Sequence, residues 1–185
     1  MKKAVFLDRD GVLNRSILVN GVPKPPTSVR EIEILEGVTE AIQILKNNEF
    51  IPVVVTNQPD VSRGKTSETH VNTINTYIGT ATGIEYFYTC FHDDVDACTC
   101  RKPKPGLILL ASSDLGLDPH KSYLVGDRWR DICAGQAAGC ENFFIDYSYK
   151  EDSPKLPYTR VSSLLEAVHI LTGERNGTKL GSSKG

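Results

Sequence analysis

Two patterns of hydrophobic positions alternate along the chain: short apolar runs, and longer stretches with one apolar face. The short runs are rich in β-branched or aromatic residues and predict strands at 4–8, 50–56, 85–91, 122–125 and 142–145. The longer stretches have apolar residues every three to four positions and predict helices at 37–48, 67–82, 106–115, 130–138 and 161–171. Strands that alternate with helices are typical of a mainly parallel sheet with helices on both faces. We therefore predict an α/β fold, a Rossmann-like three-layer α/β/α sandwich, with functional residues at the carboxyl ends of strands.

Composition and charge exclude several classes of protein. A chain of 185 residues with 39% hydrophobic residues suits one domain with a hydrophobic core. The net charge is −2 and no basic run dominates, so we do not expect nucleic acid as a partner. No apolar stretch is long enough to span a bilayer, so we expect no membrane partner either. Asp8 interrupts the first apolar run before a signal peptide could form, and we expect a cytoplasmic monomer.

The expected domain boundary lies near the carboxyl end of the chain. Residues 1–172 carry all of the predicted strands and helices and are expected to form the single domain. Residues 173–185 are polar and rich in glycine and serine, and we expect them to be disordered.

Two carboxylates, Asp8 and Asp10, follow the first predicted strand in the stretch FLDRDGVLN. Side chains two apart on an extended chain point the same way, so both should face one small volume beyond the sheet. Two charges that close repel by roughly 4 kcal/mol at an effective dielectric near 20, and a cation or a shared proton would offset this. One carboxylate could then attack a substrate while the other gives and takes a proton. The alternative is a solvated turn in which Gly11 lets the backbone bend.

Two later stretches carry groups suited to phosphate. VVVTNQ places the Thr56 hydroxyl and the Asn57 amide where the second predicted strand ends. RKPKPG places Arg101 and Lys102 just before a predicted helix, where basic groups complement an anion at the helix N-terminus. The alternatives are ordinary ones: a helix cap for the first stretch and a solvated, proline-rich loop for the second.

A further strand ends in the stretch LVGDRWRD, which contains Asp127 and Asp131. Asp127 could hold a hard cation such as Mg²⁺, which takes few protein ligands and fills its shell with water or phosphate. The alternative is that Asp127 caps the following helix. Because four strand ends or helix starts all carry phosphate- or magnesium-type groups, we favour one shared site over four separate structural explanations.

The cysteines suggest a second metal site. Five cysteines in a cytoplasmic chain favour free thiols or metal ligands over disulfides. Three thiols and one imidazole occur close together and form a complete tetrahedral set of the structural zinc type: Cys90, His92, Cys98 and Cys100. The alternative is reduced cysteines beside an unrelated histidine. We expect Asp93, Asp94 and Asp96 to face solvent between these ligands, and Cys133 and Cys140 to be small buried hydrophobic side chains.

The order DxDG, hydrophobic-TN, Lys and GD…D resembles the haloacid dehalogenase superfamily of phosphohydrolases over residues 4–172. Within it, the stretches LDRDGVLN, VTNQ…RG, CRKPKPG and VGDRWRDICAGQAAGC are similar to the D,D-heptose 1,7-bisphosphate phosphatases and the histidinol-phosphate phosphatases. The resemblance implies a haloacid dehalogenase-like core without a large cap domain. That group also carries a zinc loop, so zinc would fix the chain just before Arg101 and Lys102, although the loop is short for the group.

The resemblance also implies roles for the catalytic residues. Asp8 would be the nucleophile that forms an aspartyl phosphate, and Asp10 would be the general acid and then the base. Thr56 and Lys102 would hold the transferring phosphoryl group. Mg²⁺ would be bound by Asp8, the Asp10 carbonyl and Asp127.

Other residues match positions that contact the substrate or the metal shell in this family. Asn57, Arg101 and Arg128 are the substrate-binding candidates. Asp131 would orient Lys102 or the metal shell. The chain departs from the family at Pro59 and Asp60, where a small residue and glycine are usual, and this could alter specificity.

The long, proline-rich segment 14–37 is expected to lie over the site in place of a cap. Arg15, Lys24 and Arg63 are candidates for binding a second phosphate. A solvated surface charge is the alternative for each of them, and we favour it for Lys24.

Three functions are compatible with these features. The first is removal of the 7-phosphate of a heptose 1,7-bisphosphate, a small phosphorylated sugar, and Arg63 favours it because a second phosphate needs a basic partner. The second is a histidinol-phosphate phosphatase, which would need an acidic or aromatic pocket for a cationic substrate. The third is a non-catalytic binding protein held together by zinc, which the intact set of catalytic residues argues against.

Overall fold

The computed structural model describes residues 2–173 and contains one six-stranded sheet with the strand order β5-β4-β1-β6-β7-β8. Every pairing in this sheet is parallel, as predicted from the alternation of strands and helices. The strands are β1 (Lys3–Leu7), β4 (Phe50–Asn57), β5 (Tyr86–Cys90), β6 (Tyr123–Gly126), β7 (Glu141–Ile145) and β8 (Thr159–Val161).

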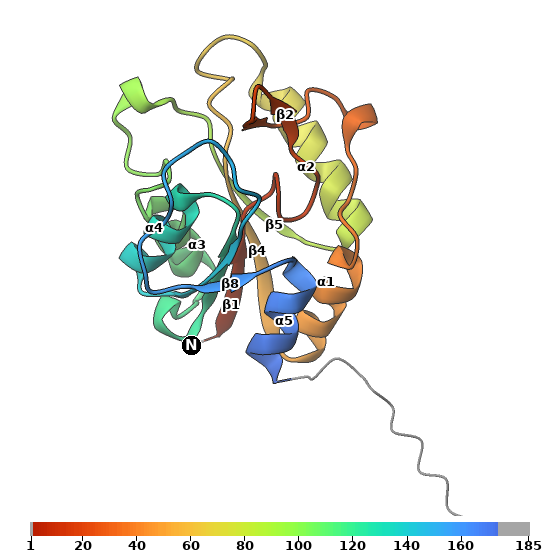
Figure 1. Ribbon diagram of the computed structural model, residues 1–185, viewed down its shortest axis with the longest axis vertical. Helices are drawn as coiled ribbons and strands as arrows, with labels where there is room; N and C mark the ends of the chain where they lie inside the picture. The colour runs from red at the N-terminus through yellow and green to blue at the C-terminus, as the bar shows by residue number, and fades with distance from the viewer. Residues whose placement is uncertain (1, 174–185) are drawn as a thin grey trace, which may run out of the picture.

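Helices cover both faces of the sheet, which gives the predicted three layers (Figure 1). One face packs against α1 (Val38–Asn47), α2 (Glu68–Thr82) and α5 (Leu164–Thr172). The other face packs against α3 (Gly106–Leu115) and α4 (Trp129–Ala138). Alternate residues of β1 point to opposite faces of the sheet. Val5 and Leu7 pack in the core on the side of α1, α2 and α5, and Ala4 and Phe6 pack in the core on the side of α3 and α4. A strand that is buried on both faces has a continuous run of apolar residues, and this run is why β1 could be predicted from the sequence.

The central position of β1 determines where the functional residues meet. This strand pairs with β4 on one side and β6 on the other, with Leu7 opposite Val54 and Val125. Because all three strands are parallel, the residues after their carboxyl ends gather at one edge of the sheet. These residues include Asp8, Thr56 and Asp127.

The predicted elements are found with ends within a few residues, but three strands were missed. The predicted helix 161–171 is wrong at its start, because Val161 pairs with Ile145 as the last residue of β8. Helix α5 begins after Ser163, whose hydroxyl accepts a hydrogen bond from the Glu166 N–H at 3.2 Å.

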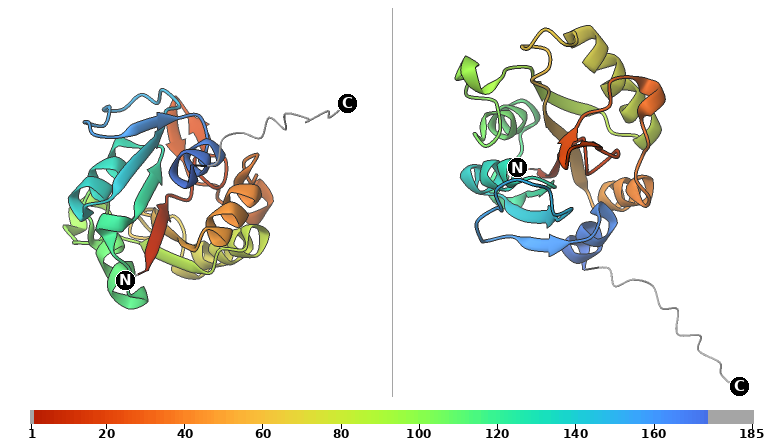
Figure 2. Two further views of the ribbon diagram at one scale, coloured as in Figure 1. Left: turned by 90° about the horizontal axis from the view of Figure 1, so that it is seen from below. Right: turned by 45° about the horizontal axis from the view of Figure 1, so that its top comes forward.

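The other two missed strands, β2 (Ile17–Val19) and β3 (Val22–Lys24), form an antiparallel hairpin within the segment 14–37. This segment also holds a single turn of 3₁₀ helix at Val29–Glu31 and no further helix or strand, so no large cap domain is inserted there. The hairpin lies at the carboxyl end of the sheet (Figures 1 and 2), as expected for a segment that covers the site.

The fold does not test two predictions, namely that residues 173–185 are disordered and that residues 1–172 form a single domain. Apart from Gly173, the segment 173–185 lies outside the described residues. The single domain at 1–172 stays a prediction. Within the described part of the chain, no helix is both long and apolar enough to cross a membrane.

Candidate active site and metal centre

The ammonium group of Lys102 lies among three oxygen atoms at the carboxyl end of β1. It donates hydrogen bonds of 2.8 Å to Asp8 Oδ1 and to the Val55 carbonyl, and it lies 2.6 Å from Asp131 Oδ1. The side chains of Lys102 and Asp131 are each 3% exposed and that of Asp8 is 11% exposed. The sequence placed Asp131 near Lys102 or a metal shell, and the structure brings it into direct contact with Lys102.

Three carboxylates in this region could hold a metal ion. Asp8, Asp127 and Asp131 each offer an oxygen, and these atoms lie within 4.8 Å of one another. Among the described residues, neither buried oxygen of Asp127 has a well-formed hydrogen bond, although the Tyr149 hydroxyl lies close enough to lower the Asp127 pKa. A buried carboxylate with so little hydrogen bonding is costly unless a cation accompanies it, and a hard cation such as Mg²⁺ fits this oxygen-only set.

Gly11 makes room for this group of carboxylates. Its φ is +92°, and a Cβ at this position would lie 1.9 Å from Asp127 Oδ2. Any larger residue would therefore collide with the Asp127 carboxylate, so the glycine of the DxDG stretch is required for close approach as well as for the turn.

The electrostatics of the site also favour a cation. Burial, together with the nearby charge of Asp131, raises the pKa of Asp8 to about 6, despite the opposing effect of Lys102. Burial and the charges of Asp8 and Asp131 raise the pKa of Asp127 well above its usual value. Burial alone would lower the pKa of Lys102, but the charges of Asp131 and Asp8 outweigh it and raise the pKa. Negative charge is therefore in excess around a single lysine.

The Asp10 carboxylate borders the same cavity as Asp8 but lies outside the group of three carboxylates. Its oxygens accept hydrogen bonds of 2.9 Å from Arg9 Nη2, Asn14 Nδ2 and Gln58 Nε2. None of these three partners, Arg9, Asn14 and Gln58, was predicted from the sequence. Binding of Mg²⁺ by the Asp10 backbone carbonyl stays a prediction.

Thr56 and Asn57 end β4 and make different contacts. The Thr56 hydroxyl is buried beside the cavity and accepts a 3.0 Å hydrogen bond from Gln58 Nε2. The Asn57 amide pairs with the backbone of Lys102, donating to its carbonyl at 3.0 Å and accepting from its N–H at 3.1 Å. Asn57 therefore holds the Lys102 loop against the end of β4 as well as bordering the cavity.

A cavity of about 260 Å³ is lined by most of these residues, namely Asp8, Asp10, Thr56, Asn57, Lys102 and Asp131, but not by the buried Asp127. The hairpin segment contributes Val22, Pro23, Lys24 and Pro25, which confirms that residues 14–37 lie beside the site. The basic residues that border the cavity are Lys24, Arg63, Arg101, Lys102, Arg128 and Arg130. Arg15 is not among the lining residues and instead pairs with Glu33 at 2.8 Å. Arg130 was not identified from the sequence.

Most of these basic side chains have acidic partners. Arg63 pairs with Asp93 at 2.6 Å and Asp60 at 3.2 Å, and Arg101 pairs with Asp94 at 2.9 Å. Arg128 pairs with Glu151, and Arg130 with Asp94 at 3.0 Å. By contrast, the Lys24 ammonium group has no hydrogen-bond or ion-pair partner within residues 2–173.

These pairs change the interpretation of the acidic residues between the cysteines. As expected, none of the three aspartates belongs to the group of zinc-type ligands, and Asp94 and Asp96 are exposed. Asp93 is only 18% exposed, and both Asp93 and Asp94 also bind arginines at the cavity, which the sequence did not predict. Asp96 accepts hydrogen bonds from the Ser62 hydroxyl at 2.6 Å and from the Asp93 N–H at 2.7 Å. The hydrogen bonds from Arg63 and Asp94 N–H lower the pKa of Asp93 to about 2. The acidic residues thus connect the cysteine loop to the loop that follows β4.

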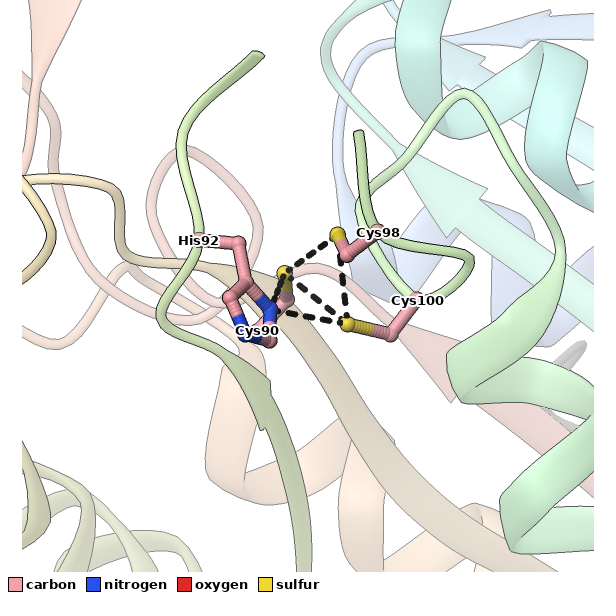
Figure 3. A group of neighbouring side chains, drawn as sticks. All are labelled: Cys90, His92, Cys98 and Cys100. Carbon is pink, nitrogen blue, oxygen red and sulfur yellow. Dashed lines mark hydrogen bonds between the residues drawn. The ribbon is translucent and has the colours of Figure 1, made fainter. Parts of the chain in front are cut away.

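The four predicted zinc ligands meet at one point (Figure 3). Cys100 Sγ lies 3.2 Å from Cys90 Sγ, 3.5 Å from Cys98 Sγ and 3.3 Å from His92 Nδ1. Cys90 Sγ lies 3.8 Å from Cys98 Sγ and 3.6 Å from His92 Nδ1. Bonds of about 2.3 Å to sulfur and about 2.0 Å to nitrogen around a tetrahedral ion would separate the ligand atoms by roughly 3.5–3.8 Å. The four side chains therefore fit a zinc ion.

The cysteine loop continues directly into the active site. The Arg101 N–H donates to Cys98 Sγ at 3.4 Å, and Lys102 is the next residue. Burial would raise the pKa of the Cys98 thiol, but the hydrogen bonds from Arg101 N–H and the neighbouring thiols outweigh it and lower the pKa to about 7. Cys140 is buried as expected, whereas Cys133 is only partly buried.

Comparison with known proteins identifies the family. The model of the haloacid dehalogenase-like hydrolases matches residues 27–139. This chain belongs to that family. A D-glycero-beta-D-manno-heptose-1,7-bisphosphate 7-phosphatase of Pasteurella multocida is 32% identical over 187 residues, covering 94% of this chain and 98% of that protein. The protein of the same name from Escherichia coli (strain K12) is 34% identical over 147 residues, covering 73% of this chain and 74% of that protein.

A solved structure agrees with this assignment. The D,D-heptose 1,7-bisphosphate phosphatase from B. bronchiseptica, complexed with magnesium and phosphate, superposes with a TM-score of 0.81 at 26% identity. The match covers 94% of this chain and 99% of that one. The hydrolase fold predicted from the sequence motifs is thereby confirmed.

Proposed function

We propose that this hydrolase is a magnesium-dependent phosphatase that removes the 7-phosphate of D-glycero-β-D-manno-heptose 1,7-bisphosphate and leaves heptose 1-phosphate for nucleotide activation. The single observation that carries the proposal is the contact between Asp8 and Lys102 beside the buried Asp127 carboxylate, which has no cationic partner among the described residues. It supports our proposal that Asp8 is the nucleophile, that Lys102 is a fixed positive charge and that Asp127 helps to hold a cation. The names of the relatives supply the sugar and the β anomer.

The chemistry that we propose proceeds in two steps. An Asp8 carboxylate oxygen attacks phosphorus, the bond between phosphorus and the sugar oxygen breaks, and Asp10 gives that oxygen a proton. Water then attacks the aspartyl phosphate, its proton passes to Asp10, and the bond between phosphorus and Asp8 breaks to release phosphate. Lys102 and the Thr56 hydroxyl stabilise charge on the other phosphoryl oxygens.

Magnesium, when bound, would offset the repulsion between the Asp8 carboxylate and the phosphate dianion. Asp8, Asp127 and the Asp10 carbonyl would hold it. Asp131 lies in the same group of carboxylates, but its 2.6 Å contact with Lys102 supports a role in holding that lysine.

The second phosphate of the substrate needs a separate basic partner. Lys24 supports this role best, because its ammonium group borders the cavity without an acidic partner in the described structure. Arg63, Arg101 and Arg128 also border the cavity, and we propose that they assist although each is already paired. The hairpin that carries Lys24 would then take the place of a cap in recognising the sugar phosphate.

We further propose that zinc at the four cysteine-loop ligands is structural. Its four side chains fill a tetrahedral shell and leave no open position for chemistry. The contact from Arg101 to Cys98 supports a role in placing Arg101 and Lys102. Five free cysteines among the described residues suit a reducing compartment, so we propose that the protein acts in the cytoplasm. We also propose that it acts as a monomer.

A histidinol-phosphate phosphatase is not favoured. Six basic side chains border the cavity, and a cationic imidazole and amine would meet an unpartnered Lys24 there. A non-catalytic role is not favoured either, because Asp8, Lys102 and Asp127 are assembled in a geometry that costs stability without a catalytic use.

The test is phosphate release with magnesium from both anomers of heptose 1,7-bisphosphate and from histidinol phosphate, with Asp8→Asn as the blank. We expect kcat/KM for the β anomer to exceed the other two by at least about a hundredfold. If histidinol phosphate is preferred, the substrate assignment is wrong although the chemistry survives. If none is hydrolysed above the Asp8→Asn blank, the catalytic proposal fails.

A further inference from the structure

Arg9 lies between the two aspartates of the FLDRDGVLN stretch and is completely buried. Its guanidinium group contacts both oxygens of the Asp10 carboxylate, with Nη2 at 2.9 Å from Oδ2 and 3.2 Å from Oδ1. Asp10 is also its only ion-pair partner within the described part of the chain. A buried cation with one anionic partner is held tightly, because the Arg9 guanidinium group is cut off from water, whereas the Asp10 side chain stays 14% exposed at the cavity.

The other end of the guanidinium is anchored in the core. Arg9 Nη1 donates a 2.9 Å hydrogen bond to Asn75 Oδ1, and Asn75 is a buried residue of helix α2. Asn75 Nδ2 in turn donates to the Thr89 hydroxyl in β5 at 3.1 Å. The Asp10 carboxylate is thus connected through Arg9 to helix α2 and to β5, the strand that lies on the other side of β4 from β1.

The contacts of Arg9 fix the orientation of the planar Asp10 carboxylate. Arg9 has a rigid fork of donors, so holding one side on Asn75 determines where the other side places the Asp10 carboxylate. A proton donor must sit within hydrogen-bond reach of the leaving oxygen, and its alignment decides how well it works.

We propose that Arg9, anchored by Asn75, is a positioning residue that aims the Asp10 carboxyl group at the oxygen that leaves phosphorus. The inference rests on the proposed function only in that Asp10 is the proton donor. It does not depend on which sugar phosphate is the substrate. Asn75 makes no contribution to the cavity lining, so it acts through Arg9 and not on the substrate.

The test compares aryl phosphates whose leaving groups differ in their need for a proton. Phenyl phosphate has a poor leaving group and depends on the acid, whereas 2,4-dinitrophenyl phosphate does not. In Asn75→Leu, which removes the acceptor for Arg9, we expect kcat/KM for phenyl phosphate to fall at least about tenfold. For 2,4-dinitrophenyl phosphate we expect a change of less than about threefold, because kcat/KM covers only the steps through phosphoryl transfer.

Two further variants keep the test decisive. Arg9→Lys retains the buried charge but cannot hold Asp10 and Asn75 together, so it should give the same selective loss even if Asn75→Leu does not fold. Asn72→Ala, on the exposed face of the same helix, is the matched control and should leave both substrates unchanged. An equal loss on both aryl phosphates in Asn75→Leu and Arg9→Lys, or no loss on either, would overturn the positioning role. If wild type hydrolyses neither aryl phosphates nor the sugar bisphosphates, it is the proposed function that fails.

Discussion

The ammonium nitrogen of Lys102 lies 2.8 Å from Asp8 Oδ1 and joins the loop after the cysteines to the central strand of the sheet. Both side chains are withdrawn from solvent, and Asp131 approaches the same nitrogen to 2.6 Å. A lysine shared by two buried carboxylates stabilises the fold, and we propose that Lys102 also acts in catalysis; these two roles lead to the first prediction.

Replacing Lys102 with methionine should abolish phosphatase activity and destabilise the fold. The change leaves Asp8 and Asp131 buried without their cation, so we expect the free energy of unfolding to fall by about 3–5 kcal/mol. Urea denaturation at neutral pH without magnesium measures this. Lys121→Met, at an exposed lysine that is 69% accessible, is the control and should change stability by less than about 0.5 kcal/mol. Equal stability of the two variants would contradict the buried ion-pair network.

Stabilisation by magnesium should depend on pH. Because the pKa of Asp8 is raised to about 6, the folded protein without metal holds a proton there that the unfolded chain releases near pH 4. The stability from this proton is present below about pH 4 and is lost as pH rises toward 6, a difference on the order of 2–3 kcal/mol. The raised pKa of Asp127 acts in the same direction.

Magnesium competes with these protons, so it should raise the melting temperature more at pH 7.5 than at pH 5. Thermal unfolding with and without magnesium at both pH values tests this. In Asp8→Asn the difference between the two pH values should shrink. A larger shift at pH 5 than at pH 7.5 would contradict the site as described.

Zinc should be needed for stability and for the placement of Arg101 and Lys102. We expect one zinc ion per chain by elemental analysis, and a fall in melting temperature when a strong chelator removes it. Cys98→Ser should lower both zinc content and phosphatase activity, since Cys98 belongs to the group of four side chains that could hold zinc and accepts a hydrogen bond from the Arg101 N–H. Cys133→Ser, outside the ligand group, should keep the zinc. Full zinc occupancy in Cys98→Ser would exclude the proposed ligand set.

Removing the Asp10 carboxylate should cost more stability than loss of a surface charge. Arg9 is completely buried and pairs with Asp10, so Asp10→Ala leaves an uncompensated buried cation. We expect a loss of about 3–5 kcal/mol in the free energy of unfolding, measured by urea denaturation. Asp114→Ala is a suitable comparison and should cost far less, because Asp114 is exposed and its side chain accepts a hydrogen bond only from the Tyr88 hydroxyl among residues 2–173. If the two losses are equal, Arg9 does not depend on Asp10.

The fold and the centre of the site could be predicted because they follow from local patterns. The strand 4–8 is apolar on both faces, and Asp8, Thr56 and Asp127 each follow a strand in sequence. Parallel strands bring their carboxyl ends to one edge, so these residues had to meet. The four predicted zinc ligands fall within eleven residues of sequence, so it was equally predictable that their side chains would meet.

The remaining features depend on contacts between distant segments. Arg9 and Asn75 are 66 residues apart in the sequence, and Arg63 and Asp93 are 30 residues apart. No local sequence pattern predicts that either pair is in contact. The two hairpin strands have three residues each, and Ile17–Val19 is exposed throughout. They are therefore too short to show an alternation of apolar and polar residues, and the first has no buried face that would give an apolar pattern. Strand β8 was hidden because Val161 also fits the apolar pattern of the following helix.

The most direct test of the account is to identify which phosphate the enzyme removes. Phosphorus NMR of D-glycero-β-D-manno-heptose 1,7-bisphosphate incubated with enzyme and magnesium resolves the two ester signals. We predict that the 7-phosphate signal is replaced by inorganic phosphate while the 1-phosphate signal persists, and that Asp8→Asn leaves both signals unchanged. Loss of the 1-phosphate signal, or equal turnover by Asp8→Asn, would contradict the account.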